Sequence, residues 1–198
     1  LAHIDDHTEV FSTDNYEVIK GEALALRAML HFDLLRCFGV SYAVNPSMPS
    51  IPYSTALDYH VFPQLKVSEV AQCILTDLKE AELLLREGDP IVTGRTITEL
   101  DDNGYLINRQ LHLNDYAVKA LQARLYMWMG LYAEALEAAT EVIESEAFSW
   151  STPENMERGY DRCLADEHIF ALNNLTLKAD IADNYFSENS TNSFAIRT

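Results

Sequence analysis

Two groups of side chains have spacings that metal sites use, and the first lies near the start of the chain. His3 and His7 are four residues apart, with Asp5 and Asp6 between them. On a helix the two imidazoles would share one face and could hold a metal ion together. Because terminal residues often fray, we favour the other interpretation, in which these four are solvated polar residues, and we predict no metal here.

The second group lies in the segment 96–110. Asp101 and Asn103 stand at the third and fifth ligand positions of a calcium loop, but Glu99 replaces the first aspartate and Gln110 replaces the bidentate glutamate. An asparagine followed by glycine also suits a tight hairpin turn that requires positive φ. We therefore predict a small β-hairpin and keep a calcium loop as the alternative.

The chain contains no pattern that identifies an enzyme. It has no G-x-S-x-G elbow, no cysteine with a plausible histidine partner and, with only seven glycines, no phosphate-binding loop. Its many carboxylates form pairs by chance, so a helical acid–base glycosidase stays a remote alternative. We predict a protein that is not an enzyme and uses no cofactor.

The charge balance narrows the range of partners. Fourteen basic and thirty-one acidic residues give a formal net charge of −17, which repels nucleic acids and anionic lipid headgroups. No stretch approaches the roughly 18 uninterrupted apolar residues of a membrane-spanning helix. We therefore predict no nucleic-acid partner and no direct membrane insertion.

The most informative pattern is the internal similarity of two apolar segments, 20–39 and 116–130, each of which ends in glycine. When the chain is shifted onto itself, Leu30 falls on Leu121 and Gly39 on Gly130. Internal repetition of this kind indicates a helical-repeat protein. Apolar periodicity, capping residues and glycine stops predict four helices, at 15–39, 68–86, 114–130 and 132–146. The apolar side chains of the first helix, which include Leu30, Leu34 and Phe38, cover more than one stripe, so we expect protein on at least two of its sides.

The remaining segments complete the predicted organisation. Residues 40–66 carry four prolines among aromatic residues and should form an ordered insertion loop. Residues 168–175 suit a short extended segment, and 176–198 suit a mobile tail. We predict one all-α domain over 1–198, with the long Pro-rich loop and the small β-hairpin as its irregular parts.

The second helix pair follows the spacing of tetratricopeptide repeats, in which small residues set how closely helices nest. Six residues occupy matching positions: Ala123, Tyr126, Gly130, Tyr132, Ala135 and Ala139. The repeat is divergent, because Lys119 stands where tryptophan is usual and Gln122 where leucine is usual. We expect the aromatic residues of this pair to fill its core.

The order and content of three segments resemble the SusD/RagB-like nutrient-binding outer-membrane lipoproteins of Bacteroidetes, which carry divergent tetratricopeptide helices. The segments are GEALALRAMLHFDLLRCFG, VSEVAQCILTDLKEAELLL and YAVKALQARLYMWMGLYAEALEAATEVI. The most specific positions lie in the first segment: Gly21, Glu22, Arg27, Phe32 and Asp33.

The resemblance implies a function. Members of this family sit at the cell surface on a lipid anchor and work with a TonB-dependent β-barrel transporter to capture oligosaccharides or other nutrients. They begin with a signal peptide and a lipidated cysteine and are considerably longer, so we expect this to be a processed or trimmed chain whose anchor is absent. Aromatic faces would then stack on sugar rings, and the loop aromatics that could do so are Tyr42, Tyr53, Tyr59 and Trp150.

Two alternatives stay open at this point. Loop aromatics often anchor their loop onto the core instead of binding a ligand. The whole chain could also be a tetratricopeptide adaptor for protein partners, although the Pro-rich insertion departs from the short turns of regular repeat arrays.

Overall fold

The computed structural model describes residues 1, 3–12, 15–56, 59, 61–98, 104–158 and 163–186 of the chain. Its helical elements, in chain order, are η1 (Asp5–Val10), α1 (Asn15–Phe38), α2 (Val67–Gly88), α3 (Pro90–Thr93), η3 (Arg109–Leu111), α4 (Asp115–Met129), α5 (Tyr132–Glu144), α6 (Pro153–Arg158), η4 (Ala165–Glu167) and the π-helical η5 (Lys178–Phe186). The prediction of an all-α helical-repeat fold is confirmed, and the four long helices begin and end within two residues of their predicted bounds.

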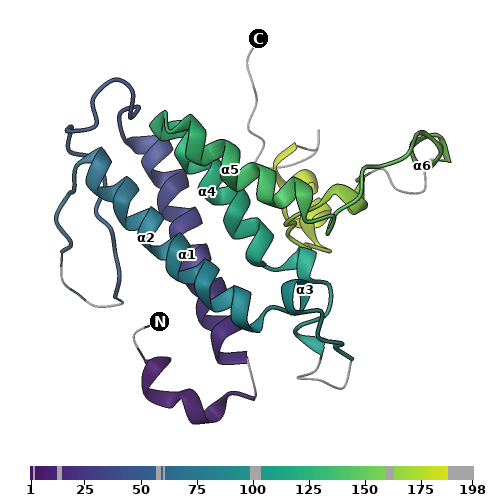
Figure 1. Ribbon diagram of the computed structural model, residues 1–198. Helices are drawn as coiled ribbons and strands as arrows, with labels where there is room; N and C mark the ends of the chain where they lie inside the picture. The colour runs from purple at the N-terminus through teal and green to yellow at the C-terminus, as the bar shows by residue number, and fades with distance from the viewer. Residues whose placement is uncertain are drawn as a thin grey trace.

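The four long helices form two antiparallel pairs. Helix α1 packs along α2, α4 packs along α5, and α2 joins the pairs by packing against α4 (Figure 1). Fully buried aliphatic side chains fill the space between them, among them Val18, Leu35, Ile74, Leu78, Leu85, Val118 and Leu125. Among the described residues, no helix combines the length and the apolar character needed to cross a membrane.

Gly21 explains how closely α1 and α2 approach each other. A Cβ atom at this position would lie 2.8 Å from Leu85 Cγ and 3.2 Å from the carbonyl oxygen of Ala81. Both contacts are with α2, and one of them is with its backbone. Glycine therefore stands in the middle of α1 despite its low helix propensity, because any side chain would push the two helices apart.

The helix ends follow the signals in the sequence. The Asn114 side chain accepts a hydrogen bond of 2.9 Å from the Ala117 amide and caps α4. Gly130 ends α4 in the left-handed conformation, with a φ of 81°. Gly39 ends α1 for a different reason, because a Cβ there would lie 2.6 Å from the carbonyl oxygen of Leu35.

The Pro-rich loop is ordered over its described part and returns to the helices. Its two arms pair through the Ser50 amide and the Leu65 carbonyl (2.8 Å), and through the Leu65 amide and the Ile51 carbonyl (3.1 Å). A single β-bridge joins Pro49 and Lys66. The side chain of Ile51 is buried, so the loop contributes to the core.

The predicted β-hairpin at 96–110 is not formed in the described residues of that segment. Residues 99–103, which include Glu99, Asp101 and Asn103 of the calcium alternative, lie outside the described part. From Gly104 onward the chain forms turns and the 3₁₀ helix η3. The physical reason is that Leu106 and Arg109 are drawn into the junction between the helices, where both are buried, and a hairpin would present these side chains on alternating faces.

Several apolar side chains that we expected in the core are exposed. Leu30, Leu34 and Phe38 are 52%, 46% and 75% exposed, because α1 is covered by α2 and α4 and its outer side faces away from both. Tyr132 is 69% exposed at the start of α5 and does not fill the interior of the second pair. Ala135, by contrast, is buried as predicted.

Candidate functional site

Tyr53 is an anchor of the Pro-rich loop. Its side chain is buried, and its hydroxyl donates a hydrogen bond of 2.5 Å to Asp77 in the middle of α2. Its ring lies against His31, with 4.1 Å between the ring centroids. Burial and the neighbouring Asp77 carboxylate both raise the pKa of the Tyr53 phenol. A sugar could not reach this ring in the structure.

Asp77 also holds α1. Arg27 donates two hydrogen bonds to it, from Nε at 2.6 Å and from the terminal nitrogen at 2.7 Å, which is the bidentate geometry that a guanidinium favours. One turn further along α1, His31 Nδ1 donates to the Arg27 carbonyl, because His31 Nε2 accepts a hydrogen bond from the Ser54 amide. The hydrogen bonds of His31 to Arg27 and Ser54 therefore fix the loop on α1.

Tyr42 is half-buried and packs against the core. Its ring meets Trp128 edge to face at 5.6 Å, and Trp128 in turn meets Phe32 at 5.8 Å. Aromatic pairs in this arrangement stabilise each other, so these contacts hold the Tyr42 ring against the core.

The other two candidate aromatics are open to solvent. Tyr59 is fully exposed, and Trp150 is 79% exposed. Trp150 borders a hollow of about 100 Å³, which is lined by Val142, Ile143, Phe148, Ser149, Trp150, Glu167 and Ile169. Trp150 is therefore a candidate aromatic whose ring is exposed and also borders a concave surface. We call this surface the Trp150 hollow.

The backbone around the Trp150 hollow is held by two segments that face each other. The Ser149 amide donates to the Asp166 carbonyl at 3.3 Å, and the Ser151 amide donates to Glu167 Oε1 at 2.9 Å. On the other side, the Phe148 ring packs edge to face on Tyr116 of α4 at 5.7 Å. These contacts fix the loop that carries Trp150 on both sides.

The Trp150 hollow combines two chemical features. The indole face and neighbouring aliphatic groups offer an apolar surface, and Glu167 is a carboxylate whose Oε1 is already oriented by the Ser151 amide. An apolar face beside a fixed hydrogen-bond acceptor suits a ligand that has a flat apolar face and hydroxyl groups at its rim.

Two further hollows continue from this one. A hollow of about 300 Å³ shares Glu167 and Ile169 with it and runs between Met29 of α1 and Ala120 of α4. Arg124 links that hollow to a third of about 480 Å³, lined by Phe32, Arg36, Ala123, Arg124, Met127, Trp128, Ala135 and Ala139. We call this third hollow the helix groove.

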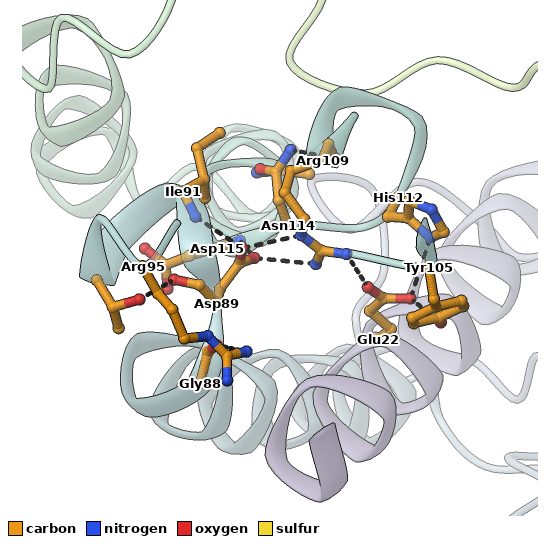
Figure 2. Close-up of polar contacts among 12 residues, drawn as sticks. Glu22, Gly88, Asp89, Ile91, Arg95, Tyr105, Arg109, His112, Asn114 and Asp115 are labelled. Atoms are coloured by element: carbon orange, nitrogen blue, oxygen red, sulfur yellow. Dashed lines mark hydrogen bonds and ion pairs between the residues drawn. The ribbon is translucent and has the colours of Figure 1, made fainter. Parts of the chain in front are cut away.

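A buried polar network, which the sequence did not reveal, joins the first helix pair to the second. Arg109 lies between two carboxylates, with two hydrogen bonds to Asp89 at 2.9 and 3.0 Å and an ion pair to Glu22 of α1 at 2.6 Å (Figure 2). Burial disfavours the charge on Arg109, but Asp89 and Glu22 outweigh burial and raise its pKa. Tyr105 donates a further hydrogen bond of 2.7 Å to Glu22.

Asp89 is the centre of this network. It is completely buried, and besides Arg109 its carboxylate accepts hydrogen bonds from the amides of Ile91 and Asp115, at 3.1 and 3.2 Å. One side chain therefore caps α3, meets the start of α4 and neutralises a buried arginine. The geometry is that of a structural junction, and it holds the end of α2 against the start of α4.

A second network explains the unusual residues of the divergent repeat. Lys119 pairs with Glu82 of α2 at 2.7 Å and with Glu141 of α5 at 2.6 Å, and Gln122 donates to Glu82 at 2.8 Å. Burial raises the pKa of the nearby Asp115 to about 6, which outweighs the opposing attraction of Arg86. A polar contact between helices thus replaces the apolar contact that tryptophan and leucine would make.

The residues that carried the family resemblance have structural roles. Gly21 permits the close approach of α1 and α2, Glu22 pairs with Arg109, Arg27 pairs with Asp77, and Phe32 is buried. Asp33 is exposed and pairs with Arg36 at 3.6 Å. Within the described ranges, no three histidine, cysteine, aspartate or glutamate side chains come together as metal ligands.

Comparison with known proteins places the chain among related sequences. Residues 1–93 match the model of the SusD-like_3 family, described as starch-binding associating with outer membrane. The SusD-like protein P38 of Formosa agariphila is 27% identical over 148 residues, which are 74% of this chain and 24% of that protein. The chain therefore spans about a quarter of the length of this curated relative.

Solved structures share the fold. A SusD superfamily protein from Bacteroides thetaiotaomicron superposes with a TM-score of 0.69 at 23% identity, over 90% of this chain and 36% of its own. A SusD-like carbohydrate binding protein from Bacteroides vulgatus gives 0.64 at 21% identity, over 85% of this chain and 32% of its own. The resemblance to the SusD family that the three sequence segments indicated is confirmed.

Proposed function

We propose that this chain is the helical-repeat part of a SusD-like protein that binds carbohydrate for nutrient uptake. The observation that carries the proposal is the match of residues 1–93 to a family described as starch-binding. Binding needs no covalent step, so the proposed protein is a capture subunit and not an enzyme.

The Trp150 hollow is the site in this chain that we propose for contact with the carbohydrate. The Trp150 ring is exposed, and the loop that carries it is fixed on both sides. Glu167 offers a carboxylate oxygen to sugar hydroxyls. Tyr59 is exposed as well and is a second candidate. We no longer propose Tyr53, whose ring is buried and whose hydroxyl is bound to Asp77, or Tyr42, which packs on Trp128.

The proposed partner is a TonB-dependent β-barrel transporter, and the proposed location is the cell surface at the outer membrane. Support comes from the family description, which associates its members with the outer membrane. Because the chain spans about a third of the related solved structures, residues outside it would complete both the carbohydrate site and the transporter contact. The fractionation of the precursor protein with outer membranes, together with a large β-barrel protein, would support this part of the proposal. A cytosolic precursor would contradict it.

Affinity electrophoresis tests carbohydrate binding. The chain should migrate more slowly through gels that contain starch or another soluble polysaccharide than through gels without it. Trp150→Ala should remove most of the retardation, whereas Tyr132→Ala, which removes another largely exposed aromatic ring, on α5, should leave it unchanged. Equal retardation of wild type and Trp150→Ala would reject the proposed site, and no retardation in a broad polysaccharide panel would reject binding by this chain.

A further inference from the structure

The helix groove is a concave apolar surface that the packing of the four long helices leaves open. Its walls come from α1 (Phe32 and Arg36), α4 (Arg124 and Met127) and α5 (Ala135 and Ala139). Met127 is 60% exposed at the rim. A surface of this size and composition suits side chains of a protein partner better than hydroxyl-rich sugars.

The neighbouring face of α5 extends the apolar surface. Tyr132, Leu136 and Ile143 follow one another on the same stripe of α5 as Ala139, and each is between 67% and 69% exposed. Helical-repeat proteins bury such a stripe by stacking a further helix on it. The small side chains of Ala135 and Ala139 leave space for the ridge of an incoming helix.

Arg124 gives the groove a charge preference. Acidic residues outnumber basic ones by thirty-one to fourteen in this chain, yet Arg124 is exposed and has no hydrogen-bonded or ion-paired partner within the part of the chain that the structure describes. Arg36 stands at the same groove, paired only weakly with Asp33 at 3.6 Å and with its guanidinium over the Phe32 ring. Two guanidinium groups beside an apolar floor match a carboxylate set among apolar side chains.

We propose that the helix groove binds an amphipathic helix whose apolar stripe contains a carboxylate that pairs with Arg124. This is a protein-docking surface, and the helix groove shares no lining residue with the Trp150 hollow. The apolar stripe of the partner would lie on Ala139 and Met127, which are at least partly open to solvent, and its carboxylate would reach Arg124 at the same groove. The rest of the partner's surface would be neutral or basic, because the field of a chain with a net charge of −17 repels a strongly acidic partner.

Designed peptides test this proposal directly. Three helical peptides share one leucine stripe and carry a glutamate, a glutamine or a lysine at the same central position of the stripe. Fluorescence anisotropy with the full chain should show the glutamate peptide binding about tenfold more tightly than the lysine peptide, with the glutamine peptide between them. The order should reverse with Arg124→Glu.

Two controls keep the result interpretable. Lys79→Glu changes the net charge by the same amount at an exposed site of α2 outside the groove, and it should leave the order of the peptides unchanged. Ala139→Gln should weaken all three peptides by placing a larger, uncharged polar side chain on the apolar floor. Failure of all three peptides to saturate, or the same order in wild type and Arg124→Glu, would overturn the proposal. So would a dimer in sedimentation velocity that Arg124→Glu disperses, because the occupant would then be a second copy of this chain.

Discussion

Gly21 offers the sharpest test of how the first helix pair is packed. A methyl group at this position would stand 2.8 Å from Leu85 Cγ and 3.2 Å from the Ala81 carbonyl oxygen. Two opposing effects act in Gly21→Ala. The greater helix propensity of alanine stabilises α1 by about 1 kcal/mol, whereas overpacking of a close helix contact costs about 1 to 3 kcal/mol. We expect a net destabilisation of roughly 1 kcal/mol.

A double-mutant cycle separates the two effects. Leu85 is fully buried, so Leu85→Ala should cost about 2 to 5 kcal/mol alone. In the double variant the methyl group introduced by Gly21→Ala enters space that the leucine vacated, so the two losses should not add. We expect the double variant to be more stable than additivity predicts by about 1 to 2 kcal/mol.

Urea denaturation followed by circular dichroism measures the free energy of unfolding of wild type, the two single variants and the double variant. Unchanged m-values would show that all four proteins expose a similar surface on unfolding. If Gly21→Ala stabilises the chain by the full propensity difference, or if the two substitutions are additive, then the close approach of α1 and α2 is not what requires glycine.

Two further predictions concern the buried polar networks. Burial raises the pKa of Asp115 from its ordinary value of 3.8 to about 6. Between these two pH values the folded chain keeps a proton on Asp115 that the unfolded chain has released. The free energy of unfolding of wild type, relative to that of Asp115→Asn, should therefore fall by about 3 kcal/mol in total as pH rises through this window. Urea denaturation of both proteins at about pH 3.5 and pH 7 measures this change, and the same difference at both pH values would contradict the prediction. Arg109→Gln should cost about 3 to 5 kcal/mol, since it leaves the completely buried Asp89 without its cation, and a loss below about 1 kcal/mol in the same assay would contradict the role of this junction.

Much of the fold was predictable because the strongest signals in the sequence are local. Apolar periodicity, the capping amide of Asn114 and the glycine that ends α4 act within a few residues of each other, so they fixed the four long helices. The Pro-rich loop was predictable for the same reason. The hairpin was not, because the turn chemistry at Gly104 is satisfied by a single turn while Arg109 is drawn to carboxylates from distant segments.

The exposed face of α1 shows a second limit of sequence reasoning. A helix that is apolar around most of its circumference was expected to be covered on several sides, yet Leu30 and Leu34 face solvent. Periodicity tells which side chains are apolar but does not tell how many neighbours are present to cover them.

The candidate site was predictable only as a set of four aromatic residues. Composition placed Tyr53 and Trp150 in loops, but it could not separate an anchor from an open ring. That distinction depends on Asp77, which lies 24 positions away from Tyr53 and accepts its hydroxyl hydrogen. Arg124 carried no sequence signal, because its role depends on the absence of a partner among the described residues that surround it.

Isothermal titration calorimetry of the Trp150 hollow tests the central claim most directly, with the oligosaccharide of whichever polysaccharide retards the chain in gels. Trp150→Ala should weaken binding by about tenfold or more, as expected for an exposed tryptophan that forms the main contact, and Tyr53→Phe should bind like wild type. Wild-type affinity in Trp150→Ala, together with a loss in Tyr53→Phe, would show that the loop anchor and not the open indole meets the sugar.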